Sequence, residues 1–467
     1  MTEGAWAPER RLLTVGLIGL VTAVAFEGMA VPTILPALVD ELGGLDLYGW
    51  AFSAFWLTNI IGITLAGSDA DRRGPARALA VGTVLFAAGL LVSGVATDMP
   101  MVIAGRAVQG FGSGALGSVV YATIARAYPA SATPRMIALV SSAWIVPGLV
   151  GPALAGLAAD TAGWRWVFLA IVPPVLVVGL ALYTQVAELG PASRTAEPSR
   201  SDARRALDAV LLAAGSTLLL AALGVDVPLL AAGLAVAGGW LALMGLRNLL
   251  PAGSLRLAPG RPSVVIGIFA IGFAFFGTEA FVPLTVVDVR GGSVTLGGLA
   301  LSAAAVTWAL ASWLQDRAAR AGARRGMVLA GVGLIAAGIA VTAGVLVPGA
   351  PVWVAALGWA IAGLGMGLAY SMLVLLMLET SAPGEEGFSS SALQLMFTLG
   401  TALGAGAGGA IVALADAGTL ALPTAVGLVD GLMALVAVAA FVIALRVPGS
   451  PAPHATRAPT AVPLEHP

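Results

Sequence analysis

The chain has 467 residues, of which 59% are hydrophobic and only 10% are charged, and its mean hydropathy is +0.97. This composition lies far from that of soluble proteins and predicts a protein that crosses a membrane many times. The absence of cysteine excludes disulfides, thiolate metal sites and thiol redox chemistry. The net charge of −1 points to no particular partner and not to nucleic acid.

Long apolar runs separated by short polar connections divide the chain into predicted membrane-spanning helices. The first six runs lie at 12–39, 50–66, 78–96, 100–127, 135–159 and 164–186. A polar linker rich in Pro, Ser and Arg follows, and then two shorter runs at 207–224 and 228–246. The last six runs lie at 263–287, 293–313, 325–347, 352–378, 389–413 and 422–446.

This pattern predicts an all-α membrane protein with 14 spans: two six-helix bundles and an inserted pair of transmembrane helices. The predicted boundaries are 1–187 for the first bundle, 188–262 for the linkers and inserted hairpin, and 263–446 for the second bundle. Residues 447–467 are expected to form a disordered cytoplasmic tail, because this segment is dominated by Pro and Ala.

The distribution of charge fixes the expected orientation. With this topology nearly all arginines fall on one side of the membrane, and only Arg165 and Arg290 fall on the other. Basic residues in short loops stay cytoplasmic, so we expect both termini to be cytoplasmic in a multi-pass protein of the inner (plasma) membrane. An aromatic belt is expected at the outer ends of the spans, formed by Tyr48, Trp50, Trp164, Trp166 and Trp353.

A short charged turn joins the second and third predicted spans. It carries the pattern Gly67-x-x-x-Asp71-Arg72-x-Gly74-x-x-Arg77 between two apolar runs, which predicts an antiparallel hairpin. Its spacing and location resemble the signature of the major facilitator superfamily between helices two and three, although Asp69 stands where that family usually has leucine. The resemblance implies a charged cytoplasmic latch between the two halves of the molecule.

The latch also carries an expectation about its partner. Ser389 opens a later predicted helix, and the positive end of that helix dipole would favour an anion such as Asp71. We therefore expect Asp71 to meet this helix N-terminus when the cytoplasmic side is shut.

The fourth predicted span contains Arg106-x-x-Gln109-Gly110. An arginine inside a membrane is costly and faces either a partner or a wet cavity. The pattern resembles the helix-4 motif of the same family, which is linked to proton coupling. A structural arginine that only braces neighbouring helices is the alternative.

The fifth predicted span carries small residues and prolines that resemble the family's exporter-associated motif: Pro147, Gly148, Gly151, Pro152 and Gly156. Small residues let helices approach closely, so simple helix packing is the alternative interpretation. Together, the three motifs and the span count resemble the fourteen-helix drug:proton antiporter branch of the superfamily.

Three acids lie inside predicted spans and are candidates for proton coupling or for lining a substrate cavity: Glu27, Glu279 and Asp430. Glu27 lies midway along the first span, and Arg106 is its expected partner. Burial favours the neutral carboxyl whereas a nearby cation favours the carboxylate, so cargo could move a proton on or off Glu27. The alternative is a permanently protonated carboxyl, and which of the three acids carries the proton stays open.

The resemblance implies a proton-coupled antiporter that exports amphipathic or cationic small molecules by alternating access. Export of a lipid or another endogenous amphiphile is the alternative, and a non-transporting membrane sensor is a further one. Neither enzyme activity nor a metal site is expected, since both histidines lie in the tail. The glycine pattern at 112–117 lies inside an apolar span without a preceding strand, so no nucleotide or other cofactor is expected. The expected partners are substrate, protons and the lipid bilayer, and the expected state is a monomer.

Overall fold

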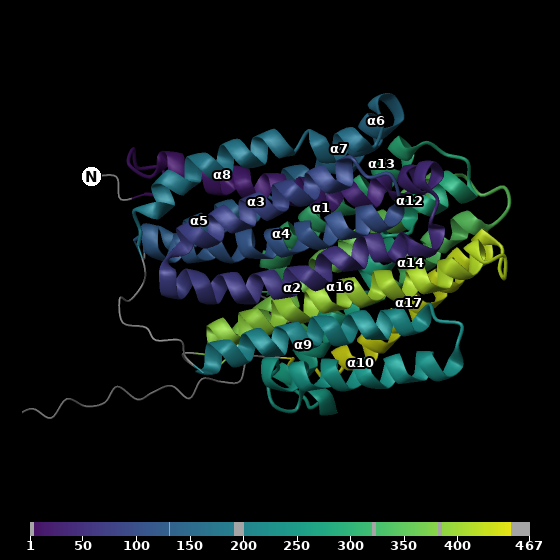
Figure 1. Cartoon of the computed structure of the whole chain (residues 1–467). Helices are drawn as coiled ribbons and strands as arrows, with labels where there is room; N and C mark the ends of the chain where they lie inside the picture. Colours follow the sequence, from purple (N-terminus) through teal and green to yellow (C-terminus); the bar gives the residue numbers. More distant parts are fainter. Residues whose placement is uncertain (1–3, 130, 191–199, 320–323, 382–384, 450–467) are drawn as a thin grey trace, which may run out of the picture.

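The protein is all helical over the residues that the computed structural model describes, which are 4–129, 131–190, 200–319, 324–381 and 385–449. The helices run roughly along one common direction, so their connections gather at two ends of the molecule (Figure 1). We call these the Gly74 end and the Asp160 end, after one residue at each. The predicted all-α class is therefore confirmed, and the tail beyond Gly449 lies outside the described residues.

Along the chain, the helices form two sets separated by a pair of helices. The first set comprises α1 (Arg11–Leu42), η1 (Leu45–Leu47), α2 (Tyr48–Arg73), α3 (Pro75–Gly94), α4 (Met99–Ala127), α5 (Thr133–Ser142), α6 (Ile145–Ala162), α7 (Arg165–Leu169) and α8 (Val172–Ala187). The pair is α9 (Arg200–Leu223) and α10 (Pro228–Leu249), followed by η2 (Ser254–Arg256). The second set comprises α11 (Arg261–Glu279), α12 (Val282–Leu284), η3 (Thr285–Val289), α13 (Val294–Ala319), α14 (Arg324–Ala343), η4 (Gly344–Leu346), α15 (Trp353–Thr380), α16 (Glu386–Asp416) and α17 (Leu422–Ala444).

Among the described residues, 13 helical segments are long and apolar enough to cross a membrane. They coincide with all the predicted spans except that at 100–127, where the structure has α4. This helix is long enough, at 29 residues, but it is less apolar because it carries Arg106, Gln109 and five glycines. The protein is thus a multi-pass membrane protein, and the count of 14 spans stays a prediction.

Three predicted helices are broken, and each break has the same cause. Proline has no N–H to donate to the carbonyl four residues earlier, so the helical ladder is interrupted there. Pro147 thereby separates α5 from α6, Pro174 separates α7 from α8, and Pro283 separates α11 from α12. By contrast, Pro32 and Pro36 lie inside the unbroken α1.

The predicted hairpin between the second and third spans is confirmed, but the turn is shorter than expected. Helix α2 continues to Arg73 and α3 begins at Pro75, so residues 67–73 are helical and only Gly74 connects the two helices. Gly74 has a φ of 90°, a conformation that side-chain-bearing residues rarely adopt. The charged motif therefore lies on the last two turns of α2, on Gly74 and on the first turn of α3.

The two sets pack against each other along two seams, α6 with α13 and α2 with α16. Helix α9 covers the second seam, since it packs against both α2 and α16, while α10 packs on α9 (Figure 1). The outer face of α10 is strongly exposed and apolar, with Leu229 84% and Val236 74% exposed. Such a surface is suited to lipid.

Candidate functional site

The predicted partnership of Glu27 and Arg106 is confirmed as an ion pair in the interior of the first set. Their side chains are 0% and 1% exposed, and Arg106 Nη1 donates to Glu27 Oε1. Arg106 Nε also donates to the Ala51 carbonyl at 3.1 Å, and Nη1 donates to Gln109 Oε1 at 2.9 Å. The guanidinium carbon lies 4.3 Å from the centre of the Phe55 ring. The buried guanidinium of Arg106 therefore has a charged partner and neutral acceptors.

This cluster is not fully satisfied by protein groups. Within the described part of the chain, Glu27 Oε2 and Gln109 Nε2 are buried and have no hydrogen-bond partner. Orphaned polar atoms in a buried cluster indicate a place for water or for a change of protonation. The third residue of the helix-4 motif has a different role, because a Cβ on Gly110 would lie 2.0 Å from the Phe55 carbonyl oxygen. Gly110 is thus where α4 touches α2.

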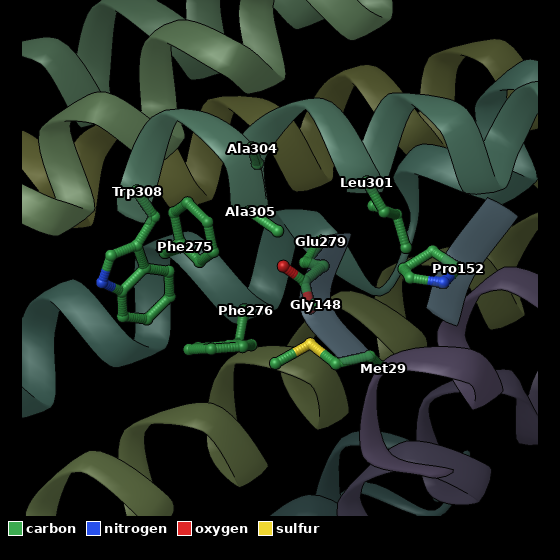
Figure 2. A pocket seen from close by; sticks show the side chains of 10 residues that line it. All are labelled: Met29, Gly148, Pro152, Phe275, Phe276, Glu279, Leu301, Ala304, Ala305 and Trp308. Carbon is green, nitrogen blue, oxygen red and sulfur yellow. The ribbon is translucent and has the colours of Figure 1, made fainter. Parts of the chain in front are cut away.

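A second acid, Glu279, ends α11 and lines a small cavity between the two sets. Figure 2 shows its carboxyl at the centre of the lining, with Met29 on one side and Ala305 on the other. The cavity has a volume of about 30 Å³, room for about one or two water molecules. Pockets for drug-sized ligands measure roughly 300–1,000 Å³, so this state is closed around Glu279.

Aromatic rings surround the Glu279 cavity on the side of the second set. Phe275 and Phe276 come from the same helix as Glu279, and Trp308 comes from α13. Phe275 stacks on Trp359 with ring centres 4.6 Å apart and meets Trp308 edge-on at 5.7 Å. No ion pair forms with Glu279 among the described residues. An acid beside several aromatic rings is suited to a cation.

The structure separates the predicted acids rather than gathering them. Glu27 belongs to the ion pair, whereas Met29, two residues later in α1, faces the cavity. Asp430 is only 5% exposed within α17, and it is not among the residues that line the Glu279 cavity. The interior therefore holds a paired acid, a cavity acid and a separate buried acid.

The small-residue motif of α6 forms the seam with the second set. Gly148 and Pro152 line the Glu279 cavity, and Pro147 and Gly151 are buried. A Cβ on Gly156 would lie 2.7 Å from Thr295 Cα, and one on Gly298 would lie 2.2 Å from the Pro152 carbonyl oxygen. These glycines let the backbones of α6 and α13 touch.

The α2–α16 seam has the same character, since a Cβ on Gly49 would lie 2.6 Å from Gly409 Cα. The Tyr48 hydroxyl donates to the Ala280 carbonyl at 3.0 Å, and Ser53 Oγ donates to the Ala402 carbonyl at 2.7 Å. Tyr48 is therefore fully buried at a seam, and its assignment to an aromatic belt is wrong.

Asp160, at the end of α6, caps the start of α13 in the other set. Its carboxylate accepts from the backbone N–H groups of Val294 at 3.2 Å and Thr295 at 2.9 Å. It also accepts from the Thr295 hydroxyl at 2.5 Å. Together with the Tyr48 and Ser53 contacts, this bond fastens the two sets at the Asp160 end. The predicted spans at 135–159 and 164–186 leave Asp160 in the connection between them, and nothing in the sequence marks it as a contact between the sets.

The belt prediction also fails at Trp164, which is 3% exposed and donates through Nε1 to Glu41 at 2.8 Å. Trp166 and Trp353 are 56% and 63% exposed, as the belt prediction requires.

The latch motif makes contacts other than those expected. Asp71 is 79% exposed and lies 3.7 Å from Arg126 of α4, so its predicted contact at Ser389 is absent from this state. Ser389 instead accepts a hydrogen bond from Arg261 at 3.0 Å. Asp69 contacts Arg73 and Arg77, at 3.4 and 3.7 Å. All of these ion pairs are partly exposed and contribute little stability each.

Two further latch residues have different surroundings. Arg72 Nε is buried without a hydrogen-bond partner among the described residues, and Gly67 approaches Ser118 of α4. The latch motif therefore packs α2 on α4 within the first set.

In the described residues no group of three or more His, Cys, Asp or Glu side chains could hold a metal ion.

Comparison with known proteins gives two relatives of note. An uncharacterized MFS-type transporter of Mycobacterium tuberculosis is 28% identical over 422 residues, which cover 87% of this chain and 60% of the relative. A probable multidrug-efflux transporter of the same species is 33% identical over 152 residues, 32% of each chain. The chain thus spans about 60% of the length of the first relative.

The fold has solved counterparts. A bacterial homolog of the human lysosomal transporter Spinster, solved inward-facing and occupied, matches with a TM-score of 0.65 at 15% identity. The match covers 96% of this chain and 99% of that one. The sequence profile of the Major Facilitator Superfamily matches residues 16–342, most of the described helices. The chain belongs to the Major Facilitator Superfamily.

Proposed function

We propose that the protein is a proton-coupled secondary active exporter of amphipathic or cationic small molecules that works by alternating access. The observation that carries this proposal is the Glu279 cavity, which is enclosed between the two sets and lined by α1, α6, α11 and α13. An acid at the interface of two sets that can separate is where a transporter of this type binds its cargo.

The seams support alternating access. At the Asp160 end the two sets meet through backbone contacts and three side-chain bridges, from Tyr48, Ser53 and Asp160. Such contacts break together when the sets rock apart, and they re-form when the sets close. The cavity would then enlarge from the present volume of about 30 Å³ to admit cargo.

The Glu27–Arg106 pair supplies a chemistry for coupling. A proton arriving at Glu27 would neutralise the carboxylate, and Arg106 would keep its contacts to Gln109 and the Ala51 carbonyl. Arg106 would then be a buried cation without a counter-ion, which is costly. Protonation of Glu27 would therefore favour a change of structure around Arg106. Glu279 and Asp430 are the other acids that could carry the proton.

The cavity favours a cationic or amphipathic cargo because its lining combines Glu279 with aromatic and aliphatic side chains. The names of relatives agree with this class, since one is a probable multidrug-efflux transporter. The same apolar lining would also suit a lipid-like amphiphile, which is the second candidate cargo. A membrane sensor without transport is a third possibility, and it would need no closed cavity.

We also propose the topology that the charges predict. In it α4 is a fourteenth span, the two sets are six-helix bundles over 1–187 and 263–446, and α9 and α10 are an inserted hairpin. Helix α4 packs between α2 and α3, where its glycines and Arg106 are sheltered from lipid. The Gly74 end and both termini would be cytoplasmic, the membrane would be the inner (plasma) membrane, and the protein would be monomeric.

The test uses purified protein in liposomes with tetraphenylphosphonium as the cationic probe. A proton gradient should drive the wild type to accumulate the probe against its concentration gradient. Glu27→Gln should abolish this uphill movement, because no carboxyl is left at the ion pair to exchange a proton. Asp226→Asn, at an exposed acid between α9 and α10, is the matched control and should transport normally.

A Glu27→Gln variant that still accumulates the probe would remove Glu27 from the coupling mechanism. If the wild type moves fluorescent phospholipid but not tetraphenylphosphonium, the cargo is lipid. If it moves neither while folded, the exporter proposal fails.

A further inference from the structure

We propose that Tyr48 is a positioning residue for Glu279: its hydroxyl ties the break at the end of α11 to closure of the Asp160 end. The importance of Glu279 itself rests on the proposed function. Tyr48 belongs to the first set and Glu279 to the second, so the bond links the two sets at the point where the cavity acid is attached.

The backbone directly after Glu279 is not held by a regular helix. Glu279 is the last residue of α11, and Pro283 cannot donate to the Glu279 carbonyl. The chain adapts locally, because Phe281 N–H bonds to the Thr278 carbonyl at 2.9 Å, and a π-helical segment, η3, follows. Helix irregularities and π-helical turns of this kind are frequent at functional sites and hinges. A group that holds this break can therefore influence the direction of the Glu279 carboxyl.

Tyr48 contacts the two residues that directly follow Glu279. Its hydroxyl donates to the Ala280 carbonyl at 3.0 Å, and its ring stacks on Phe281 with ring centres 5.4 Å apart. The Tyr48 side chain is 0% exposed, so the ring has no room to swing while the sets are closed. A hydroxyl and a ring thus hold the break from the other set.

The contact between Tyr48 and the residues after Glu279 depends on the packing of α2 against α16. Gly49, the next residue in α2, touches the backbone of Gly409, and a Cβ on Gly408 would lie 2.4 Å from the Phe281 ring. The Phe281 ring is therefore held against Tyr48 of α2 and Gly408 of α16, where these two helices meet. When α2 and α16 part, the Ala280 carbonyl loses the hydroxyl, and the Glu279 carboxyl loses its fixed direction.

The experiment measures closure directly and needs neither cargo nor a gradient. The natural chain has no cysteine, so Ala162→Cys and Ala417→Cys introduce the only labelling sites, both exposed at the Asp160 end of opposite sets. Spin-label distances in lipid nanodiscs then give the ratio of open to closed molecules. The Glu279→Gln effect on this ratio is measured in the parent, in Tyr48→Phe and in Ser53→Ala.

In the parent, Glu279→Gln should shift the ratio toward the closed form about fivefold or more, because an unpaired acid no longer has to be buried on closure. In Tyr48→Phe this shift should fall below about twofold, since a carboxyl that is no longer held in one direction can turn toward water and escape the burial cost. Ser53→Ala also removes a hydroxyl-to-carbonyl bond from α2 to α16, but Ser53 does not touch the α11 break. It should therefore open the end while leaving the Glu279→Gln shift intact.

An equal Glu279→Gln shift in Tyr48→Phe and in the parent would overturn the positioning role, as would the absence of a shift in the parent. A loss of the shift in both Tyr48→Phe and Ser53→Ala would make Tyr48 merely one of several seam contacts, and the inference would also fail. The liposome assay judges the exporter proposal separately, because the distance measurement involves no transport.

Discussion

Removing one member of the Glu27–Arg106 pair should destabilise the fold far more than removing both. The pair is 0% and 1% exposed, so Glu27→Gln leaves a guanidinium inside the first set with only neutral acceptors. Breaking a buried pair in this way costs about 3–5 kcal/mol, mostly because the remaining charge is uncompensated. The double variant Glu27→Gln/Arg106→Gln buries no charge and should recover most of that loss.

The assay is unfolding in mixed micelles, followed by tryptophan fluorescence and compared as a double-mutant cycle. We expect a coupling energy of about 3 kcal/mol or more between positions 27 and 106. Glu279→Gln is the matched control, because it removes a membrane-embedded acid without an ion pair and should cost much less. If Glu27→Gln costs no more than Glu279→Gln, or if the two single effects simply add, the buried pair does not have the energetic role that its burial implies.

Three further predictions test other contacts. Asp160→Ala removes the cap that joins the two sets and should raise the open-to-closed ratio at that end about 2- to 30-fold, whereas Asp98→Ala, which removes a cap within one set, should not. Gly74→Ala should destabilise the fold by about 1–2 kcal/mol in thermal unfolding, because φ is 90° there, and Gly117→Ala should instead be neutral or stabilising. A reporter fused at Asp226 should report the side opposite to reporters at positions 200 and 252, and a report from the same side would contradict the inserted hairpin.

Much of the helical architecture follows from local sequence, and particular residues show why. Apolar runs of membrane length predict spans. Proline cannot donate a hydrogen bond to the carbonyl four residues earlier, which explains the breaks before Pro147 and Pro283. The Glu27–Arg106 partnership was predictable because each is the only charged residue away from the ends of its predicted helix, and neither charge is tolerated alone in a membrane.

The contacts between the sets were not predictable in the same way. Tyr48 meets Ala280 and Asp160 meets Thr295 across more than a hundred residues, and no periodicity or motif marks such pairs. Tyr48 lies at the end of a predicted span, as an aromatic residue of the membrane interface would. Only the packing of α2 on α16 shows that it is buried. Asp71 was assigned to the N-terminus of a distant helix from the helix dipole, whereas in this state it lies 3.7 Å from Arg126 of the neighbouring α4.

The glycine contacts at the seams give the molecule a sensitivity that its chemistry does not reveal. At Gly49, Gly156 and Gly298 one set touches the backbone of the other, so the closed form has no space there for even one methyl group. Alanine at any of these positions would push against backbone, which cannot yield as a flexible side chain does. Each substitution would leave every acid, arginine and aromatic ring in place while penalising closure. Alanine variants at these three positions should therefore favour the open form to different degrees. They would allow the widened cavity to be studied while the side chains that bind cargo stay unchanged.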